Sequence, residues 1–462
     1  MSTGTSIRRQ AEHLRGGLDT SAALTQALLD RIAATNARTC AFIRVDSAGA
    51  LAAARQADAE LANGRVRSPL HGIPVAVKDI YDVAGQPTTC HSKLRLDHVA
   101  EDDSGPVQRL RDAGAVLLGK LATHEFALGG PSFDLPFPPA RNPWDLDRIP
   151  GGSSSGSGAA IAAGYTRIAL GSCTGGSIGV PAAWCGAVGL KPTYGRVSKY
   201  GVFPLSWTLD HCGPLTRSVE DAALTLQVLA GHDARDPSSA AVPVADYTAD
   251  LERGVGNLRV GVPRHTFQNS PLASAAFLDA MSNTEAQLEE AGAVLSEVTL
   301  PDPDVFLACG RVINSAEIFS VHRDWVRERP QDYGELTLPR FLLGAAIGSE
   351  DYLTAMRVRR QLAAGVNSVL EHVDVLLTAV TLDVAPPFEP TPHFRFWPVQ
   401  TYVFNVTGHP TVTVPVGLSA QGLPLAVQVV GRYFDEATVL RVARAIERLS
   451  GWERQALPDL QG

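Results

Sequence analysis

Two patterns of hydrophobic residues alternate over most of the chain: amphipathic helical patterns and short continuous apolar runs. Apolar residues at positions i, i+3 and i+4 are typical of an amphipathic helix, and short β-branched runs between turn residues are typical of a buried strand. The helical pattern predicts helices over residues 20–36, 46–62, 274–291, 350–371 and 436–449, and a further helix that begins at 106. The apolar runs predict strands over residues 71–77, 115–118, 258–263, 373–377, 411–416 and 424–430. This alternation indicates an α/β protein in which helices cover both faces of one large sheet.

Composition and charge narrow the classes of function. The 462 residues are 45% hydrophobic and can bury a large core, and length alone favours two or three domains. The net charge is −8, with acids and bases mixed and no basic stripe, which argues against nucleic acid or a membrane surface as the main partner. No apolar run approaches the roughly 18 residues of a membrane span, and the polar residues 1–17 lack the apolar core of a secretory signal. We therefore expect a cytoplasmic protein.

The cysteines and histidines do not form a metal-binding pattern. The six cysteines are scattered without a C-x-x-C pair, and His124-Glu125 lacks the second histidine of H-E-x-x-H. The cysteines are typical of free thiols in a reducing cytosol. We expect no metal and no cofactor.

Two Gly/Ser-rich stretches, residues 151–158 (GGSSSGSG) and 171–177 (GSCTGGS), flank the apolar segment 159–163. Glycines let the backbone approach a ligand closely, and clustered hydroxyls beside backbone N–H donors are typical of hydroxyl chemistry. A flexible linker has a similar composition but lacks an apolar segment between its halves. The stretches therefore indicate a site at which a serine reacts.

The serine motifs alone leave the type of site open. Residues 152–156 and 175–179 both match G-x-S-x-G, the nucleophile elbow of α/β-hydrolases, and His322, His393 and His409 are candidate bases for it. A lysine base is the alternative, and Lys78 follows the apolar run 71–77. Burial there would disfavour the ammonium form and make a neutral amine accessible near pH 7. A surface lysine paired with Asp79 is the structural alternative for Lys78.

Several longer motifs occur in a fixed order. They are residues 72–79 (GIPVAVKD), 141–145 (RNPWD), 151–154 (GGSS), 174–182 (TGGSIGVPA), 185–193 (CGAVGLKPT) and 405–410 (NVTGHP). With these motifs the chain resembles the amidase signature family over nearly its whole length. The resemblance implies the amidase signature fold, a large mixed central sheet with helices on both faces. It also implies one domain over 1–462, with a helical segment 1–65, a catalytic core of about 66–230 and a C-terminal completion of about 258–462.

The resemblance also implies roles for individual residues. Ser177 would be the nucleophile, Ser153 the bridging serine and Lys78 the base, and the Gly152–Ser153 peptide would be cis. The oxyanion hole would consist of backbone N–H groups of Thr174, Gly175, Gly176 and Ser177.

Two positions depart from the family pattern, since Cys173 stands where an Asp is usual and Gly179 where an Arg is usual. Loss of both partners of a buried ion pair can be nearly neutral, whereas loss of one is costly. We therefore hypothesise that the two changes compensate each other in the loop that carries Ser177.

The implied reaction is hydrolysis of an amide C–N bond through an acyl-enzyme. We expect a stand-alone amidase, assembled as a homodimer, whose partner is a small carboxamide with an apolar or aryl acyl group. The alternatives are a glutamine amidotransferase-type subunit of a tRNA-charging complex and a non-catalytic scaffold. That amidotransferase branch carries an acid for the substrate ammonium shortly before the Asn-x-x-Gly-x-Pro stretch, whereas residues 394–400 (FRFWPVQ) hold none. Candidate substrate contacts are Ala127, Phe137, Phe203, Trp207, Trp397 and, for a carboxylate, Arg359.

Overall fold

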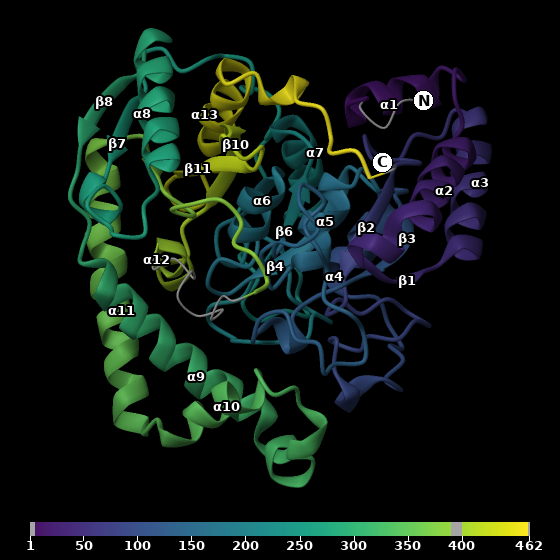
Figure 1. Ribbon diagram of the computed structural model, residues 1–462. Coiled ribbons are helices and arrows are strands. Elements are labelled where there is room, and N and C mark those ends of the chain that lie inside the picture. The colour runs from purple at the N-terminus through teal and green to yellow at the C-terminus, as the bar shows by residue number, and fades with distance from the viewer. Residues whose placement is uncertain (1–4, 390–399, 461–462) are drawn as a thin grey trace.

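One mixed sheet of eleven strands runs through the computed structural model, which describes residues 5–389 and 400–460 (Figure 1). The strand order is β1-β3-β2-β4-β6-β5-β10-β11-β9-β7-β8. Their bounds are β1 Phe42–Val45, β2 Pro74–Lys78, β3 Val116–Leu121, β4 Ile168–Cys173, β5 Val188–Lys191, β6 His211–Thr216, β7 Arg259–Val262, β8 Val294–Glu297, β9 Val375–Thr378, β10 Thr411–Leu418 and β11 Pro424–Val430. The predicted α/β class and mixed sheet are confirmed.

Thirteen α-helices in the described ranges surround the sheet. Their bounds are α1 Ile7–Arg15, α2 Ser21–Thr39, α3 Ser47–Ala62, α4 Gly105–Asp112, α5 Ser155–Ala162, α6 Gly179–Cys185, α7 Val219–Leu229, α8 Ala275–Glu290, α9 Pro303–Glu328, α10 Leu338–Leu342, α11 Ser349–His372, α12 Gln400–Thr407 and α13 Glu436–Leu449. In the part of the chain that the structure describes, no helix is both long and apolar enough to cross a membrane.

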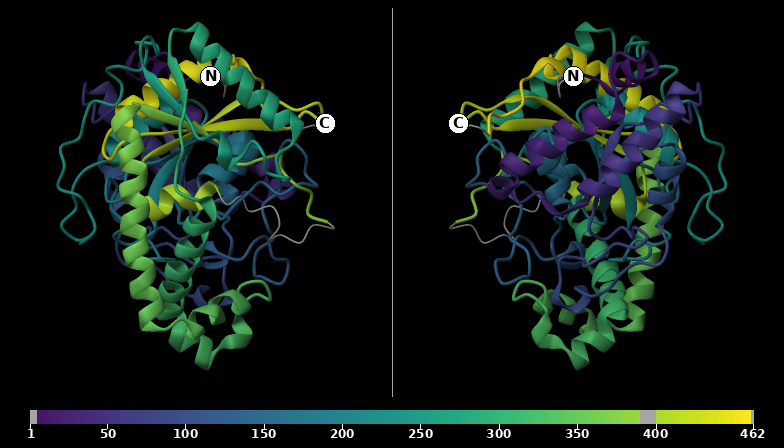
Figure 2. Two further views of the ribbon diagram at one scale, coloured as in Figure 1. Left: turned by 90° about the vertical axis from the view of Figure 1, so that its left-hand side faces the viewer. Right: turned by 90° about the vertical axis from the view of Figure 1, so that its right-hand side faces the viewer.

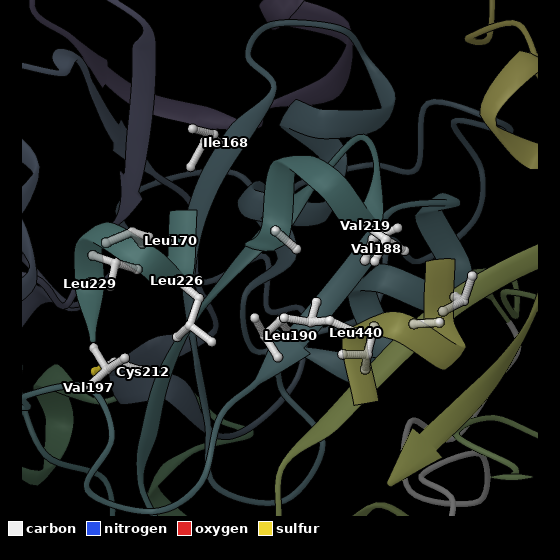
Figure 3. Close-up of a cluster of buried hydrophobic side chains, with 14 of the residues drawn as sticks. Ile168, Leu170, Val188, Leu190, Val197, Cys212, Val219, Leu226, Leu229 and Leu440 are labelled. Carbon is white, nitrogen blue, oxygen red and sulfur yellow. The ribbon is translucent and has the colours of Figure 1, made fainter. Parts of the chain in front are cut away.

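Side chains of the central strands enter two different cores, because successive residues of a strand point to opposite faces. Val75 and Val77 of β2 join a core formed with α4, α7, α8 and α13, whereas Ala76 faces a core formed with α2 and α5. Strand β4 divides in the same way, with Ile168 and Leu170 on the first face and Ala169 on the second. Figure 3 shows the first core between β4, β5, α7 and α13. Both faces of the central sheet are therefore buried.

Strands β2 and β4 are parallel neighbours, so their carboxyl ends meet at one edge of the sheet. Lys78 ends β2 and Cys173 ends β4, and both Gly/Ser stretches lie at this edge, where α5 and α6 begin. The long helices α9 and α11 pack against each other and extend beyond the sheet, with α10 near their far end (Figures 1 and 2). Helix α12 packs against α9 and faces the same edge. The fold thus places the serine stretches opposite a helical wall.

Candidate active site

Lys78 is completely buried at the end of β2. Burial disfavours the ammonium form and lowers the pKa of Lys78 to about 7, although the nearby Cys173 and Asp210 side chains work in the opposite direction. Its neighbour Asp79 pairs instead with Lys120, at 2.8 Å. Lys78 is therefore not a surface lysine paired with Asp79, and a large fraction of it is neutral near pH 7.

Three serine hydroxyls surround the Lys78 amine. The distances from Nζ to the hydroxyl oxygens are 2.7 Å for Ser153, 2.9 Å for Ser172 and 3.1 Å for Ser154. An ammonium group can donate to all three, but a neutral amine has two N–H donors and one lone pair. Ser154 already directs its own proton to the Ser172 carbonyl oxygen, at 3.2 Å, and so accepts from Lys78 in either state. When Ser172 accepts the second N–H, the lone pair is left for Ser153, which is the shortest contact.

The Gly152–Ser153 peptide is cis, as the family resemblance implies. The two glycines before Ser153 let this turn lie against its neighbours. A Cβ on Gly151, whose φ is +82°, would lie 2.7 Å from the Pro181 Cα, and a Cβ on Gly152 would lie 2.1 Å from the His124 ring. The turn brings the Ser154 amide within 3.4 Å of the Ser177 carbonyl oxygen, so the two serine stretches are in direct contact.

The loop of residues 174–177 is held by groups from distant parts of the chain. Asp210 accepts a 2.6 Å hydrogen bond from the Thr174 hydroxyl, and its other oxygen accepts from the amides of Leu205 and Ser206. Thr401 donates to the Gly175 carbonyl oxygen at 2.8 Å. Within the described part of the chain, the N–H groups of residues 175–177 have no acceptor, so they remain available to a ligand.

A cavity of about 330 Å³ lies between the serine stretches and the helical wall. Ser153 and Ser177 line it together with Arg311 of α9, Arg340 of α10 and Tyr402 of α12, and the Tyr402 ring lies against Gly175. Burial lowers the pKa of Arg340 to about 10, so this side chain stays cationic at neutral pH. Burial raises the pKa of Tyr402, and the hydrogen bond from Asn314 and the two arginines oppose this rise. The cavity therefore joins a hydroxyl–amine cluster to a cationic wall.

The predicted substrate contacts are scattered. Ala127 lines this cavity, whereas Phe137 lines another one, beside Asp79 and Lys120. Phe203 stacks on Trp325, and Trp207 is 59% exposed. Trp397 lies outside the described residues. None of the described aromatic contacts lines the cavity that holds Ser177, whereas Phe203 and Trp207 line a neighbouring pocket with Ser172.

Arg359 is held away from the cavity. Its guanidinium donates to the backbone oxygens of Val406, at 2.7 Å, and Thr208, at 2.8 Å. Among the described residues, the cationic side chains that line the cavity are Arg311 and Arg340, which the sequence did not single out. Ser154 and Ser172 were also missed as neighbours of Lys78, although both lie in the predicted serine stretches. Within the described ranges, no group of three or more His, Cys, Asp or Glu side chains is placed to hold a metal ion.

Cys173 and Gly179 occupy different surroundings. The buried Cys173 thiol lies 3.3 Å from Oδ1 of Asn405, whose amide donates to the Cys173 carbonyl oxygen at 2.8 Å. A Cβ on Gly179 would lie 2.8 Å from Val380 and 3.1 Å from the Thr413 hydroxyl. These neighbours differ, so any compensation between the two positions would act through the loop between them.

The fold and this cluster define an amidase. The family model described as Amidase matches residues 23–440, and the chain therefore belongs to the amidase family. A relative from Myxococcus xanthus, which is one subunit of a glutamyl-tRNA(Gln) amidotransferase, is 40% identical, covering 97% of this chain and 98% of the relative. The corresponding protein from Thermotoga maritima has a solved structure that is 33% identical, with a TM-score of 0.83, covering 96% of this chain and 95% of its own. Another solved chain, described as part of a vestigial complex that reveals the origins of an s-triazine catabolic enzyme, is 35% identical, with a TM-score of 0.91 and coverage of 96% and 98%.

These relatives correct two expectations. A stand-alone amidase for small carboxamides with apolar or aryl acyl groups is contradicted, since relatives about 40% identical over nearly the full length are amidotransferase subunits. The expected partners, a small amide and a second copy without nucleic acid, are contradicted as well, because these relatives are named for a complex that acts on a charged tRNA. Net charge is a property of one chain and does not report whether that chain works with partner subunits. The described aromatic residues Phe137, Phe203 and Trp207 line other pockets than the one that holds Ser177.

Proposed function

We propose that this chain is the amide-hydrolysing subunit of an amidotransferase-type complex, in which it releases ammonia for a second substrate bound with partner subunits. The observation that carries the proposal is the buried Lys78 amine, 2.7 Å from the Ser153 hydroxyl, beside a cavity that Ser177 also lines. The similarity to glutamyl-tRNA(Gln) amidotransferase subunits over nearly the whole chain supports the assembly. The amide bears a carboxylate, since Arg311 and Arg340 give the cavity two cationic side chains.

In the first half of the reaction, neutral Lys78 accepts the proton of Ser153 while Ser153 accepts the proton of Ser177. The Ser177 oxygen then bonds to the amide carbonyl carbon, and the N–H groups of residues 175–177 stabilise the negative charge on the carbonyl oxygen. The relay returns the proton to the nitrogen as the C–N bond breaks. Ammonia leaves, and the acyl group remains on Ser177 as an ester.

In the second half, water attacks the ester carbonyl and gives a proton to the relay. Ser153 passes this proton back to Ser177 as the C–O bond breaks, and the carboxylic acid leaves. Lys78 thus acts first as a base and then as an acid, which requires a pKa near the working pH. Burial sets the Lys78 pKa at about 7.

The decisive experiment measures ammonia release from glutamine and other carboxylate-bearing amides, by the purified chain and by the assembly recovered with a tagged chain from its own cells. We expect release by wild type, none by Ser177→Ala, and a higher rate in an assembly that also binds tRNA. A folded wild-type protein that releases no ammonia in either form would leave a non-catalytic scaffold as the better account. Full activity of a lone homodimer, with no partner recovered, would refute the assembly.

A further inference from the structure

The ring of Tyr402 occupies a slot between two glycines. A Cβ on Gly175 would lie 2.7 Å from the Tyr402 Cζ, which is the atom that carries the hydroxyl. A Cβ on Gly310 of α9 would overlap the Cδ1 edge of the same ring. Neither glycine has a positive φ, so the slot needs their lack of a side chain and not their backbone freedom. Glycine weakens a helix interior, and the ring gives a reason for its presence in α9. Tyr402 is therefore fixed between α9 and the loop of residues 174–177.

The hydroxyl of Tyr402 is oriented by Asn314. This buried side chain lies one turn beyond Gly310 on α9, and its amide donates to the Tyr402 hydroxyl oxygen at 3.3 Å. A hydroxyl has one proton, and the bond from Asn314 occupies a lone pair on its oxygen. Among the residues that the structure describes, the Tyr402 proton has no acceptor. Burial raises the pKa of Tyr402, so the hydroxyl keeps its proton at neutral pH and is available as a hydrogen-bond donor.

The Tyr402 hydroxyl lies beside the place where the amide carbonyl is expected to bind. Tyr402 and Asn314 line the same cavity as Ser177, and the hydroxyl-bearing end of the ring is the part nearest Gly175. The N–H groups of residues 175–177 are the donors assigned above to the carbonyl oxygen. An acyl chain bound there would pass the hydroxyl within a few bonds of its carbonyl. An oxygen in that part of the chain can accept the Tyr402 proton, whereas a methylene group displaces water and leaves the donor unpaired, which weakens binding.

We infer that Tyr402 determines specificity for the acyl group: its hydroxyl donates a hydrogen bond to an oxygen acceptor a few bonds from the scissile carbonyl. Asn314 is a positioning residue, because it occupies a lone pair of the hydroxyl and so directs the proton into the cavity. The preferred amides are those with an ether, carbonyl or carboxylate oxygen in the acyl chain. The inference rests on the proposed function, since it concerns the amide that is hydrolysed at Ser177.

Four amides test the inference, and three of them have the same shape. Pentanamide has no acceptor in its chain, whereas 3-methoxypropanamide and 2-ethoxyacetamide each replace one of its methylene groups with an ether oxygen. Glutamine supplies a carboxylate. The assay measures ammonia release at pH 8, by the purified chain and by the recovered assembly, and gives kcat/KM for each donor. The ratio of each value to that of pentanamide is compared between variants, because this comparison cancels differences in the chemical reactivity of the donors.

Replacement of Tyr402 by phenylalanine keeps the ring and removes the hydroxyl. Tyr402→Phe should lower the ratio for glutamine about tenfold and the ratio for the better ether about threefold, mainly through KM, because a hydrogen bond to a charged acceptor is the stronger one. Tyr433→Phe is the matched control. The Tyr433 hydroxyl donates to the Thr407 carbonyl oxygen of α12 at 2.6 Å and does not line the cavity, so its loss should leave every ratio unchanged.

Two further variants keep the hydroxyl but move its proton or its ring. Asn314→Asp introduces a carboxylate that accepts the Tyr402 proton, so the ether ratios should fall as in Tyr402→Phe although the hydroxyl is still present. Gly310→Ala inserts a Cβ at the ring edge and favours the helix, so it should displace the ring in a folded protein and lower the same ratios. Gly310→Ala provides the test if Tyr402→Phe does not fold.

The outcomes separate this inference from the proposed function. If Tyr402→Phe lowers kcat/KM for all four donors by the same factor, the hydroxyl acts on the amide group that they share, and the inference is wrong. It is also wrong if Tyr402→Phe changes the ratios no more than Tyr433→Phe does, and wild-type ether ratios in Asn314→Asp would refute the positioning role of Asn314. In each of these cases amide hydrolysis at Ser177 stands. If the folded wild type hydrolyses none of the four donors, the proposed function fails and the inference fails with it.

Discussion

Replacement of Ser154 by alanine tests how the Lys78 amine is aimed. Ser154 accepts from Nζ at 3.1 Å, and with Ser172 it occupies the two N–H donors of the neutral amine. Without Ser154 one donor is unpaired, so the amine can rotate and its lone pair no longer points consistently at Ser153. The ammonium form, which uses all three hydroxyls, loses a charge-assisted hydrogen bond, and the pKa of Lys78 falls further below 7.

The size of the effect follows from these two losses. Three equivalent orientations of the amine reduce the productive fraction about threefold, or ~0.65 kcal/mol. A hydrogen bond to a charged group is worth about 1.5–3 kcal/mol, and roughly half of that, about one pKa unit, separates the two protonation states. An amine with a lower pKa is also a weaker base, which costs about a further threefold, so we expect kcat/KM at pH 8 to fall about tenfold, or ~1.4 kcal/mol in transition-state stabilisation. The midpoint of the pH–rate profile should move down by about one unit.

The assay is ammonia release over pH 5 to 9, with Ser157→Ala as the matched control. Ser157 lies one turn along the same buried helix and donates to the Leu170 carbonyl oxygen at 2.9 Å, without contact to Lys78. Ser157→Ala therefore reports only the cost of losing a buried serine hydroxyl on α5. If both variants keep the wild-type midpoint, or if Ser157→Ala shifts it as far as Ser154→Ala, the orienting role of Ser154 is refuted.

Three further predictions concern the same centre. Because the neutral form of Lys78 is the active base and its pKa is about 7, kcat/KM should rise tenfold per pH unit below pH 7 and level off above pH 7. A pH–rate profile that is flat from pH 5.5 to 8 would argue against Lys78 as the base. Asp210→Asn should lower the free energy of unfolding, measured in urea, by about 2–3 kcal/mol, because the hydrogen bonds of Asp210 to the Thr174 hydroxyl and two amides are buried. It should also move the midpoint of the pH–rate profile to lower pH, since Asp210 favours protonated Lys78. An unchanged unfolding free energy and an unchanged midpoint would disprove the positioning role of Asp210. Cys173→Asp should raise the Lys78 pKa and destabilise the fold by about 2–4 kcal/mol, whereas Cys173→Ser should keep activity. If Cys173→Asp changes neither the Lys78 pKa nor the stability, the hypothesis of compensation with Gly179 fails.

The sequence located the candidate site better than it located the walls of the cavity. The apolar run before Lys78 and the two Gly/Ser stretches could be identified because local composition carries the signal. Their proximity follows from parallel pairing of β2 and β4, and β4 itself was not predicted, since its sequence IALGSC ends in small polar residues. Strand β6 was missed as well, because Pro214 lies within a central strand, where proline is rare.

The cavity wall could not be predicted for a different reason. Arg311 and Arg340 lie on helices where an arginine normally signifies exposure, and the packing of α9 and α10 over the sheet edge places both on the cavity wall, although Arg311 remains exposed. Arg359 has a similar sequence context but is bound by two backbone carbonyl oxygens. Which arginine lines the cavity is thus a property of tertiary packing, and helical periodicity does not encode it.

The most direct test of the central claim is the site and the pH dependence of labelling by a fluorophosphonate, followed by intact-protein and peptide mass spectrometry. The account predicts one adduct, on Ser177, with a labelling rate that rises through a midpoint near pH 7 and falls at least a hundredfold in Lys78→Ala and in Ser153→Ala. A label on another residue, or labelling of Ser177 at the wild-type rate in Lys78→Ala, would contradict it.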